Sequence, residues 1–246
     1  GDIGFASPAS SAEAMADALS AVGIPEFADP IRAVDCLRAT ITAHHQRLRN
    51  EGADYPEVDI LQVWDDVLHA LRAQGTPMIP ISEVNRHQLA IEYEVRINPV
   101  WPMPHLRSCL VTLSDHGLAL GIISNAQFFT VELFPALLDE SLESLGFDPE
   151  LQVYSYRHGQ AKPGEYLFHR AAETFASRGI RQDEILYIGN DMVNDILPAS
   201  RIGFRTALFA GDARSLRRRE NDSRVAEVSP DVVFTDLMQW TQCITR

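Results

Sequence analysis

The sequence predicts an α/β fold with a doubly wound parallel sheet, joined to an all-helical domain. Within residues 99–246, short apolar stretches alternate with helical stretches of about 10–15 residues, a pattern typical of parallel strands linked by crossover helices. These strands are apolar on both faces, as a sheet covered by helices on both sides requires. Residues 8–98, in contrast, show the spacing of amphipathic helices, so we expect a helical domain there.

The helical domain is expected to contain about four helices. Ser10 or Ser11, followed by Glu13, is typical of a helix start with an acid in the first turn. Gly23 and Pro25 then end this first helix. Apolar positions continue at helical spacing in three further stretches. The predicted helical stretches are 10–22, 31–45, 58–71 and 82–97.

Three prolines within Asn98–Pro104 mark the boundary between the two domains. Proline fixes φ and restrains the residue before it, so this segment is expected to be a stiff connector and a hinge. Strands and helices are predicted to alternate after it. The predicted strands are 118–124, 151–155, 184–189, 205–209 and 231–234, and the predicted helices are 106–114, 131–145, 164–178, 194–202 and one after residue 235.

Composition and charge exclude several classes of protein. Of the 246 residues 46% are apolar and 22% are charged, so the chain is expected to fold. With 21 basic and 34 acidic side chains the formal net charge is −13, which disfavours nucleic acid and anionic membranes as partners. No apolar run approaches the ~18–20 residues that span a bilayer. Cys36, Cys109 and Cys243 are predicted to be free thiols in a reducing, cytoplasmic compartment.

Polar residues follow three of the predicted strands, at the edge of the sheet where open α/β folds bind ligands. Ser124 and Asn125 end one strand, and Lys162 lies just beyond the next. Asp191 and Asp195 follow the strand predicted at 184–189. Carboxylates suit Mg²⁺, while a lysine and a hydroxyl suit phosphate oxygens. The set predicts phosphoryl transfer, in which catalysis is mainly positioning and electrostatics.

In their order and spacing, these residues resemble the motifs of the haloacid dehalogenase-like (HAD) superfamily of hydrolases. Gly121–Ala126 is similar to the second motif, in which a serine or threonine binds phosphate. Lys162-Pro163 is similar to the third, and Ile188–Ala199 to the acidic metal motif, the fourth. The resemblance covers about residues 104–246. It implies a HAD-like, Rossmann-type core with residues 8–98 as a helical cap, and a Mg²⁺-dependent phosphatase of a small phosphorylated metabolite.

The resemblance also implies a role for each site residue. Ser124 and Lys162 would neutralise the oxygens of the transferring phosphoryl group, and Asn125 would bind phosphate or else cap the next helix. Asp191 would hold Mg²⁺ with the support of Asp195. The cap would close over the site and exclude water, so small substrates are expected.

The chain departs from the family pattern at the first motif, which supplies the nucleophilic aspartate in the family. Asp2-Ile3-Gly4 has no preceding strand and no following Gly-Thr, and Asp65-Asp66 lies inside a helical pattern. We therefore expect the chain to begin just after that motif, by about 20 residues, since a strand of about 5–6 residues and a turn would supply it. An aspartate in that segment would form the aspartyl-phosphate.

Two other functions stay open at this point. One is a dehalogenase reaction at a carbon–halogen bond on the same fold, and the other is a binding protein that lacks the nucleophile. Asn190 fits a second alignment of the fourth motif, so it could take the place of one of the two aspartates. The basic residues Arg214 and Arg217–Arg219 are expected to form a solvated helix end. The substrate, the pathway and the oligomeric state are not predicted.

Overall fold

The computed structural model describes the backbone of residues 10–24 and 29–244, and the side chains of these residues as far as 241. The chain divides into two compact units, Asp2–Val100 and Trp101–Arg246. Among the described helices, none combines the length and the apolar character needed to cross a membrane. Cys36 and Cys109 are free thiols, whereas the side chain of Cys243 lies outside the described residues.

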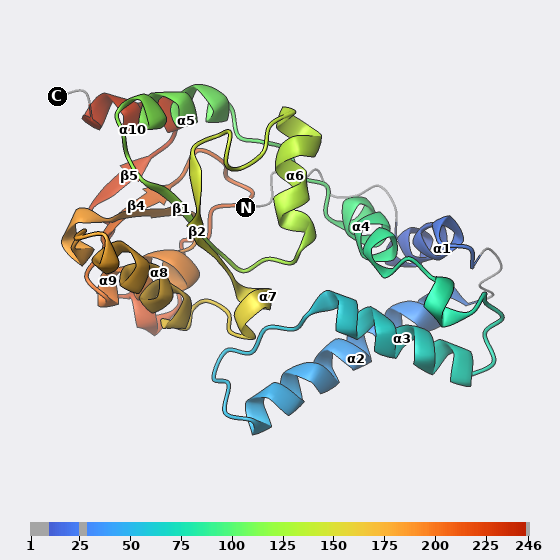
Figure 1. Cartoon of the computed structure of the whole chain (residues 1–246). Coiled ribbons are helices and arrows are strands. Elements are labelled where there is room, and N and C mark those ends of the chain that lie inside the picture. The colour runs from blue at the N-terminus through green and yellow to red at the C-terminus, as the bar shows by residue number, and fades with distance from the viewer. Residues whose placement is uncertain (1–9, 25–28, 245–246) are drawn as a thin grey trace. The chain divides into compact units, whose positions relative to one another are not determined.

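The described part of the unit Asp2–Val100 is helical. Its helices are α1 (Ser11–Ala21), α2 (Pro30–Asn50), α3 (Ile60–Ala73) and α4 (Arg86–Ile97), with a 3₁₀ turn at Ile81–Glu83 (Figure 1). α1 begins with the predicted capping box, in which Ser10 and Glu13 each accept a hydrogen bond from the other's backbone N–H. α1 packs against α2 and α4, and α2 packs against α3. In this core the rings of Trp64 and Tyr93 meet edge to face, 5.7 Å apart.

The described strands of the unit Trp101–Arg246 are parallel to the strands they pair with, as the sequence predicts. They are β1 (Leu120–Ser124), β2 (Phe147–Tyr154), β3 (Leu186–Gly189), β4 (Arg205–Phe209) and β5 (Val232–Phe234) (Figure 1). β1 pairs with β2, and β4 lies between β3 and β5. Because β1 and β3 do not pair, the strands form a two-stranded and a three-stranded sheet.

The pairing of β1 with β2 depends on a glycine. A Cβ on Gly121 would lie 2.9 Å from both the Cβ and the carbonyl oxygen of Leu151, so only glycine lets the two strands approach this closely. Further along, Ile123 lies opposite Val153 and Ser124 opposite Tyr154. This register places Ser124 at the carboxyl end of β1.

Helices lie on both sides of the strands, as a doubly wound fold requires. Figure 1 shows α5 and α10 together on one side, and α8 and α9 on the other. α8 packs against β1 and β2, α9 packs against β4, and α10 packs against α5. The helices of this unit are α5 (Leu106–Asp115), α6 (Phe129–Leu138), α7 (Ser155–His158), α8 (Tyr166–Ser177), α9 (Leu197–Arg201) and α10 (Leu237–Ile244).

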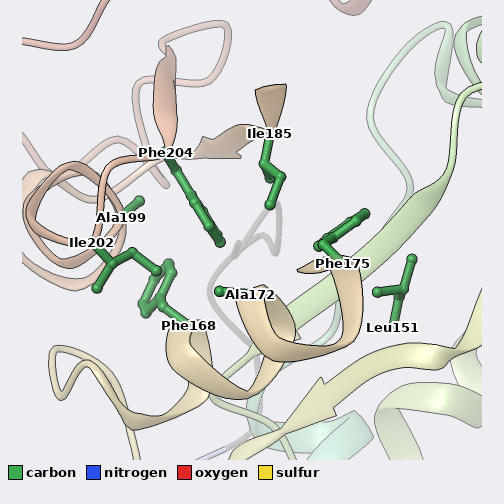
Figure 2. Close-up of a cluster of buried hydrophobic side chains, with 8 residues drawn as sticks. All are labelled: Leu151, Phe168, Ala172, Phe175, Ile185, Ala199, Ile202 and Phe204. Carbon is green, nitrogen blue, oxygen red and sulfur yellow. The ribbon is translucent and has the colours of Figure 1, made fainter. Parts of the chain in front are cut away.

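α8 joins the two sheets through the buried cluster in Figure 2. Phe168 of α8 is fully buried, and its ring centroid lies 4.9 Å from that of Tyr187 on β3 and 6.4 Å from that of Phe204 before β4. Leu151 of β2 belongs to the same cluster. Its other members are Ala172, Phe175, Ile185, Ala199 and Ile202.

Several predicted helices have different bounds, and two of these differences have a clear local cause. The helix predicted at 131–145 ends at Leu138, because Asp139 adopts a left-handed conformation with φ 57°. The helix predicted at 194–202 begins earlier, with the π-helical turn η3 (Met192–Ile196) ahead of α9. It begins there because the Asp191 carboxylate caps it by accepting hydrogen bonds from the backbone N–H groups of residues 193 and 194.

We expect Phe168→Ala to lower the free energy of unfolding by about 3–5 kcal/mol, because it removes a fully buried ring from the cluster that joins the sheets. The matched control is Tyr166→Ala, which removes a ring that is 46% exposed at the start of the same helix. Tyr166→Ala should lower the free energy of unfolding by less than about 1 kcal/mol. Urea unfolding measures both values, and equal losses would show that the cluster does not hold the sheets together.

Candidate functional site

Two of the predicted site residues meet at the carboxyl ends of β1 and β3. Lys162 lies in the loop between α7 and α8, and Asp195 lies on η3, which follows β3. Lys162 Nζ lies 2.5 Å from Asp195 Oδ1, and the two side chains are only 10% and 5% exposed. The sequence predicts that both residues lie at this edge of the strands, and the structure adds a buried ion pair between them although they are 33 residues apart in sequence.

Lys162 is the chain's only lysine. Its ammonium donates hydrogen bonds to Asp195 Oδ1, to the Tyr187 hydroxyl at 3.0 Å and to the Ile123 carbonyl oxygen at 3.3 Å. Burial alone lowers the pKa of Lys162, but the charge of Asp195 and the hydrogen bonds to Tyr187 and Asp195 outweigh burial and raise this pKa above its ordinary value. Lys162 is therefore a fixed positive charge at the carboxyl ends of the strands.

Asp195 accepts hydrogen bonds on both of its carboxylate oxygens. Oδ1 accepts from Lys162 Nζ and lies 3.1 Å from the Tyr187 hydroxyl. Oδ2 accepts from the backbone N–H groups of Asn190 and Asp191, each at 3.0 Å. Since a carboxylate has about four acceptor positions, this side chain is saturated by its protein partners.

β3 supplies two residues that were not among the predicted site residues, Tyr187 and Gly189. The hydroxyl oxygen of Tyr187 lies 3.1 Å from both Asp195 Oδ1 and the Ile123 carbonyl oxygen, so the hydroxyl can donate its single proton to either one. Burial raises the pKa of Tyr187, so its hydroxyl stays neutral. A Cβ on Gly189 would collide with the Asp195 side chain, so glycine leaves the room that this carboxylate fills. The signal in the sequence is their spacing, because residues two apart in a strand share one face.

Asn125 positions the loop that carries Lys162. Its Oδ1 accepts a hydrogen bond from Lys162 N at 2.7 Å, and its Nδ2 donates one to the Lys162 carbonyl oxygen at 3.0 Å. Asn125 does not cap the next helix, the second role considered for it, because α6 begins after Phe128. Ser124 ends β1 and is half-buried between Ile123 and Asn125, both of which contact Lys162.

The basic run Arg217–Arg219 is not the solvated helix end that its charge pattern predicts. Arg219 forms a two-pronged ion pair with Asp191, with Nη2 2.6 Å from Oδ2 and Nε 3.1 Å from Oδ1. The backbone N–H groups of Val193 and Asn194 also donate to Oδ1. Burial alone raises the pKa of Asp191, but Arg219 and these amides outweigh burial and hold this pKa below its ordinary value.

Asp191 and Asp195, as they are arranged, do not fit a Mg²⁺ ion. Mg²⁺ binds carboxylate oxygens directly, and here each carboxylate is already paired with a protein cation, Arg219 or Lys162. Across the described residues, no three His, Cys, Asp or Glu side chains gather into a group that would hold a metal. Asn190, the alternative residue of the motif, donates its side-chain amide to a backbone carbonyl at 2.6 Å. A metal ion would have to displace one of the two cations.

Because Lys162 is the chain's only lysine, protein labelled with ¹³C-lysine gives one Cε signal. We expect this signal to keep its ammonium shift as the pH passes about 10.4, the ordinary lysine value. Asp195→Asn removes the charge that offsets burial, so the pKa of Lys162 should fall below the wild-type value. Asp183→Asn, which removes an exposed carboxylate paired with Arg181, is the control and should leave it unchanged. Titration at the ordinary pKa in the wild type would contradict this account.

Comparison with known proteins finds similarity in sequence and in fold. Residues 160–240 match the family model described as HAD-hydrolase-like. Over 161 residues the chain is 24% identical to the glyceraldehyde 3-phosphate phosphatase of Methanocaldococcus jannaschii. This match covers 65% of the chain and 62% of that relative's length.

Solved structures share the fold over nearly the whole chain. The 2-haloacid dehalogenase of Pseudomonas syringae pv. tomato DC3000 is 20% identical, with a TM-score of 0.60 over 96% of this chain and 90% of that one. The L-2-haloacid dehalogenase RSc1362 is 17% identical, with a TM-score of 0.53 over 96% of this chain and 92% of that one. The family model over residues 160–240 and the fold of these structures support the resemblance of the chain to the haloacid dehalogenase-like superfamily.

Proposed function

We propose that this chain is a hydrolase that removes the phosphoryl group from a small phosphorylated metabolite. The observation that carries the proposal is the buried Lys162 ammonium, which is held by Asp195 and Tyr187 and donates to the carbonyl oxygen of Ile123, the residue before Ser124 at the carboxyl end of β1. A positive charge at the end of the strand that Ser124 closes suits the oxygens of a phosphoryl group. The similarity in sequence to a glyceraldehyde 3-phosphate phosphatase supports a phosphorylated substrate.

In the proposed reaction, Lys162 and Ser124 neutralise the phosphoryl oxygens while an aspartate attacks phosphorus and the alcohol leaves. Water then hydrolyses the resulting aspartyl-phosphate and frees inorganic phosphate. Asp191 and Asp195 do not serve as this nucleophile, because both oxygens of each carboxylate already accept hydrogen bonds. Their part is to hold the two protein cations in place.

We propose that the nucleophilic aspartate lies on a strand that pairs with the free edges of β1 and β3. Within the part of the chain that the structure describes, β1 pairs only with β2, and β3 pairs only with β4. Near the end of β1, the Ile123 carbonyl oxygen accepts hydrogen bonds from side-chain groups of Lys162 and Tyr187. A strand placed there would end beside Lys162, where the family pattern requires the aspartate.

We assign the helical unit Asp2–Val100 the role of a cap. Closure of a helical cap excludes water from the reacting atoms and limits the size of the substrate. Within this assignment, the proline-rich segment Asn98–Pro104 is the hinge on which the cap moves.

A dehalogenase reaction is the second candidate, and the ion pair between Asp191 and Arg219 favours it. A carboxylate that is bound by a guanidinium is not free to bind the metal that the phosphatase reading implies. Release of phosphate from a phosphate ester, compared with release of chloride from 2-chloropropionate, separates the two reactions. Activity that survives EDTA would favour the dehalogenase.

In protein that carries the proposed nucleophile, we expect Lys162→Ala to reduce phosphate release from glyceraldehyde 3-phosphate by about 10²–10³-fold or more, because it removes the charge that stabilises the transition state. The matched control is Arg170→Ala, which removes an exposed cation of α8 that pairs with Glu173. This control should retain wild-type turnover. Full activity in the Lys162→Ala protein would overturn the proposed function.

A further inference from the structure

The site holds two carboxylates, and each has its own protein cation. Asp195 is paired with Lys162, and Asp191 is paired with Arg219. The Asp191 side chain is 9% exposed, and both of its oxygens face the guanidinium. Asn194 also donates its side-chain amide to Asp191 Oδ2 at 3.2 Å. In this arrangement Asp191 has no oxygen left for a further cation.

The backbone, and not only the ion pair, keeps Arg219 in place. Arg217 N donates to the Asn190 carbonyl oxygen at 2.8 Å, and Met192 N donates to the Arg217 carbonyl oxygen at 2.9 Å. These two bonds make an isolated parallel bridge between Arg217 and Asp191. Arg219 follows with φ 55°, a left-handed conformation that is uncommon for a residue with a side chain. The bridge and this turn direct the guanidinium to the Asp191 carboxylate.

A guanidinium and a divalent ion compete for the same carboxylate. Arg219 makes two charge-assisted hydrogen bonds to Asp191, one to each oxygen, which is the strongest geometry for this pair of side chains. A metal ion that binds Asp191 must break both bonds and place two positive groups side by side. Loss of a hydrogen bond to a charged group corresponds to roughly a tenfold change in affinity, so the pair should weaken metal binding by at least that factor.

We propose that the guanidinium of Arg219, by pairing with the carboxylate of Asp191, excludes divalent metal ions from this carboxylate. At Asp191, where the fourth motif of the family implies a metal ion, the carboxylate thus binds a guanidinium of the protein itself. The inference concerns which cation Asp191 binds, and it does not depend on the substrate or on the proposed hydrolysis.

Binding of Mn²⁺, followed by electron paramagnetic resonance, tests the inference without any measurement of activity. Arg219→Ala should bind Mn²⁺ at least about tenfold more tightly than the wild type. The matched control is Arg218→Ala, which removes an exposed neighbouring arginine that pairs with Glu220 and so changes the net charge equally. Arg219→Ala combined with Asp191→Asn should lose the gain, because it removes the carboxylate.

Thermal unfolding verifies that each variant is folded, and Arg219→Gln takes the place of Arg219→Ala if the latter unfolds. Tighter Mn²⁺ binding in the Arg219 variant alone, lost with Asp191→Asn, supports the inference. Equal affinities in the Arg219 and Arg218 variants would overturn it. A gain that persists after Asp191→Asn would also overturn it, because the metal would then bind elsewhere.

Discussion

The site depends on one interaction, the buried ion pair between Lys162 and Asp195. A charge taken out of water is costly unless it is paired and hydrogen-bonded. Asp195 meets that requirement with four donors, and Lys162 meets it with three acceptors. Those partners come from β1, from β3 and from the turn after β3, so satisfying one ion pair also brings the ends of two separate sheets together.

The same constraint limits which residues fit around the site. Gly189 leaves the space that the Asp195 carboxylate fills, and Asn125 holds both backbone polar groups of Lys162. In an acidic protein with a net charge of −13, the carboxylates at this edge are neutralised one by one. Each ion pair is neutral as a whole, so this edge does not repel a small anion as the net charge of the chain would.

Much of this site can be predicted from the sequence, and physical reasons explain why the rest cannot. Lys162 and Asp195 each follow a strand of a parallel α/β fold, so their meeting follows from topology alone. Tyr187 lies in an apolar strand, where its spacing of two residues from Gly189 indicates only that the two share a face of the strand. Arg219 reaches Asp191 through an isolated bridge in a loop, and no local periodicity indicates that kind of contact. The division of the strands into two sheets depends on pairing, which burial patterns do not reveal.

A double-mutant cycle on Lys162 and Asp195 tests the central claim most directly. Lys162→Met and Asp195→Leu should each lower the free energy of unfolding by about 3–5 kcal/mol, because each leaves one buried charge without its partner. The double variant leaves neither charge, so its loss should be smaller than the sum of the two by more than about 1 kcal/mol. If the loss in the double variant equals the sum of the two single losses to within about 0.5 kcal/mol, the two side chains act independently, and this account is contradicted.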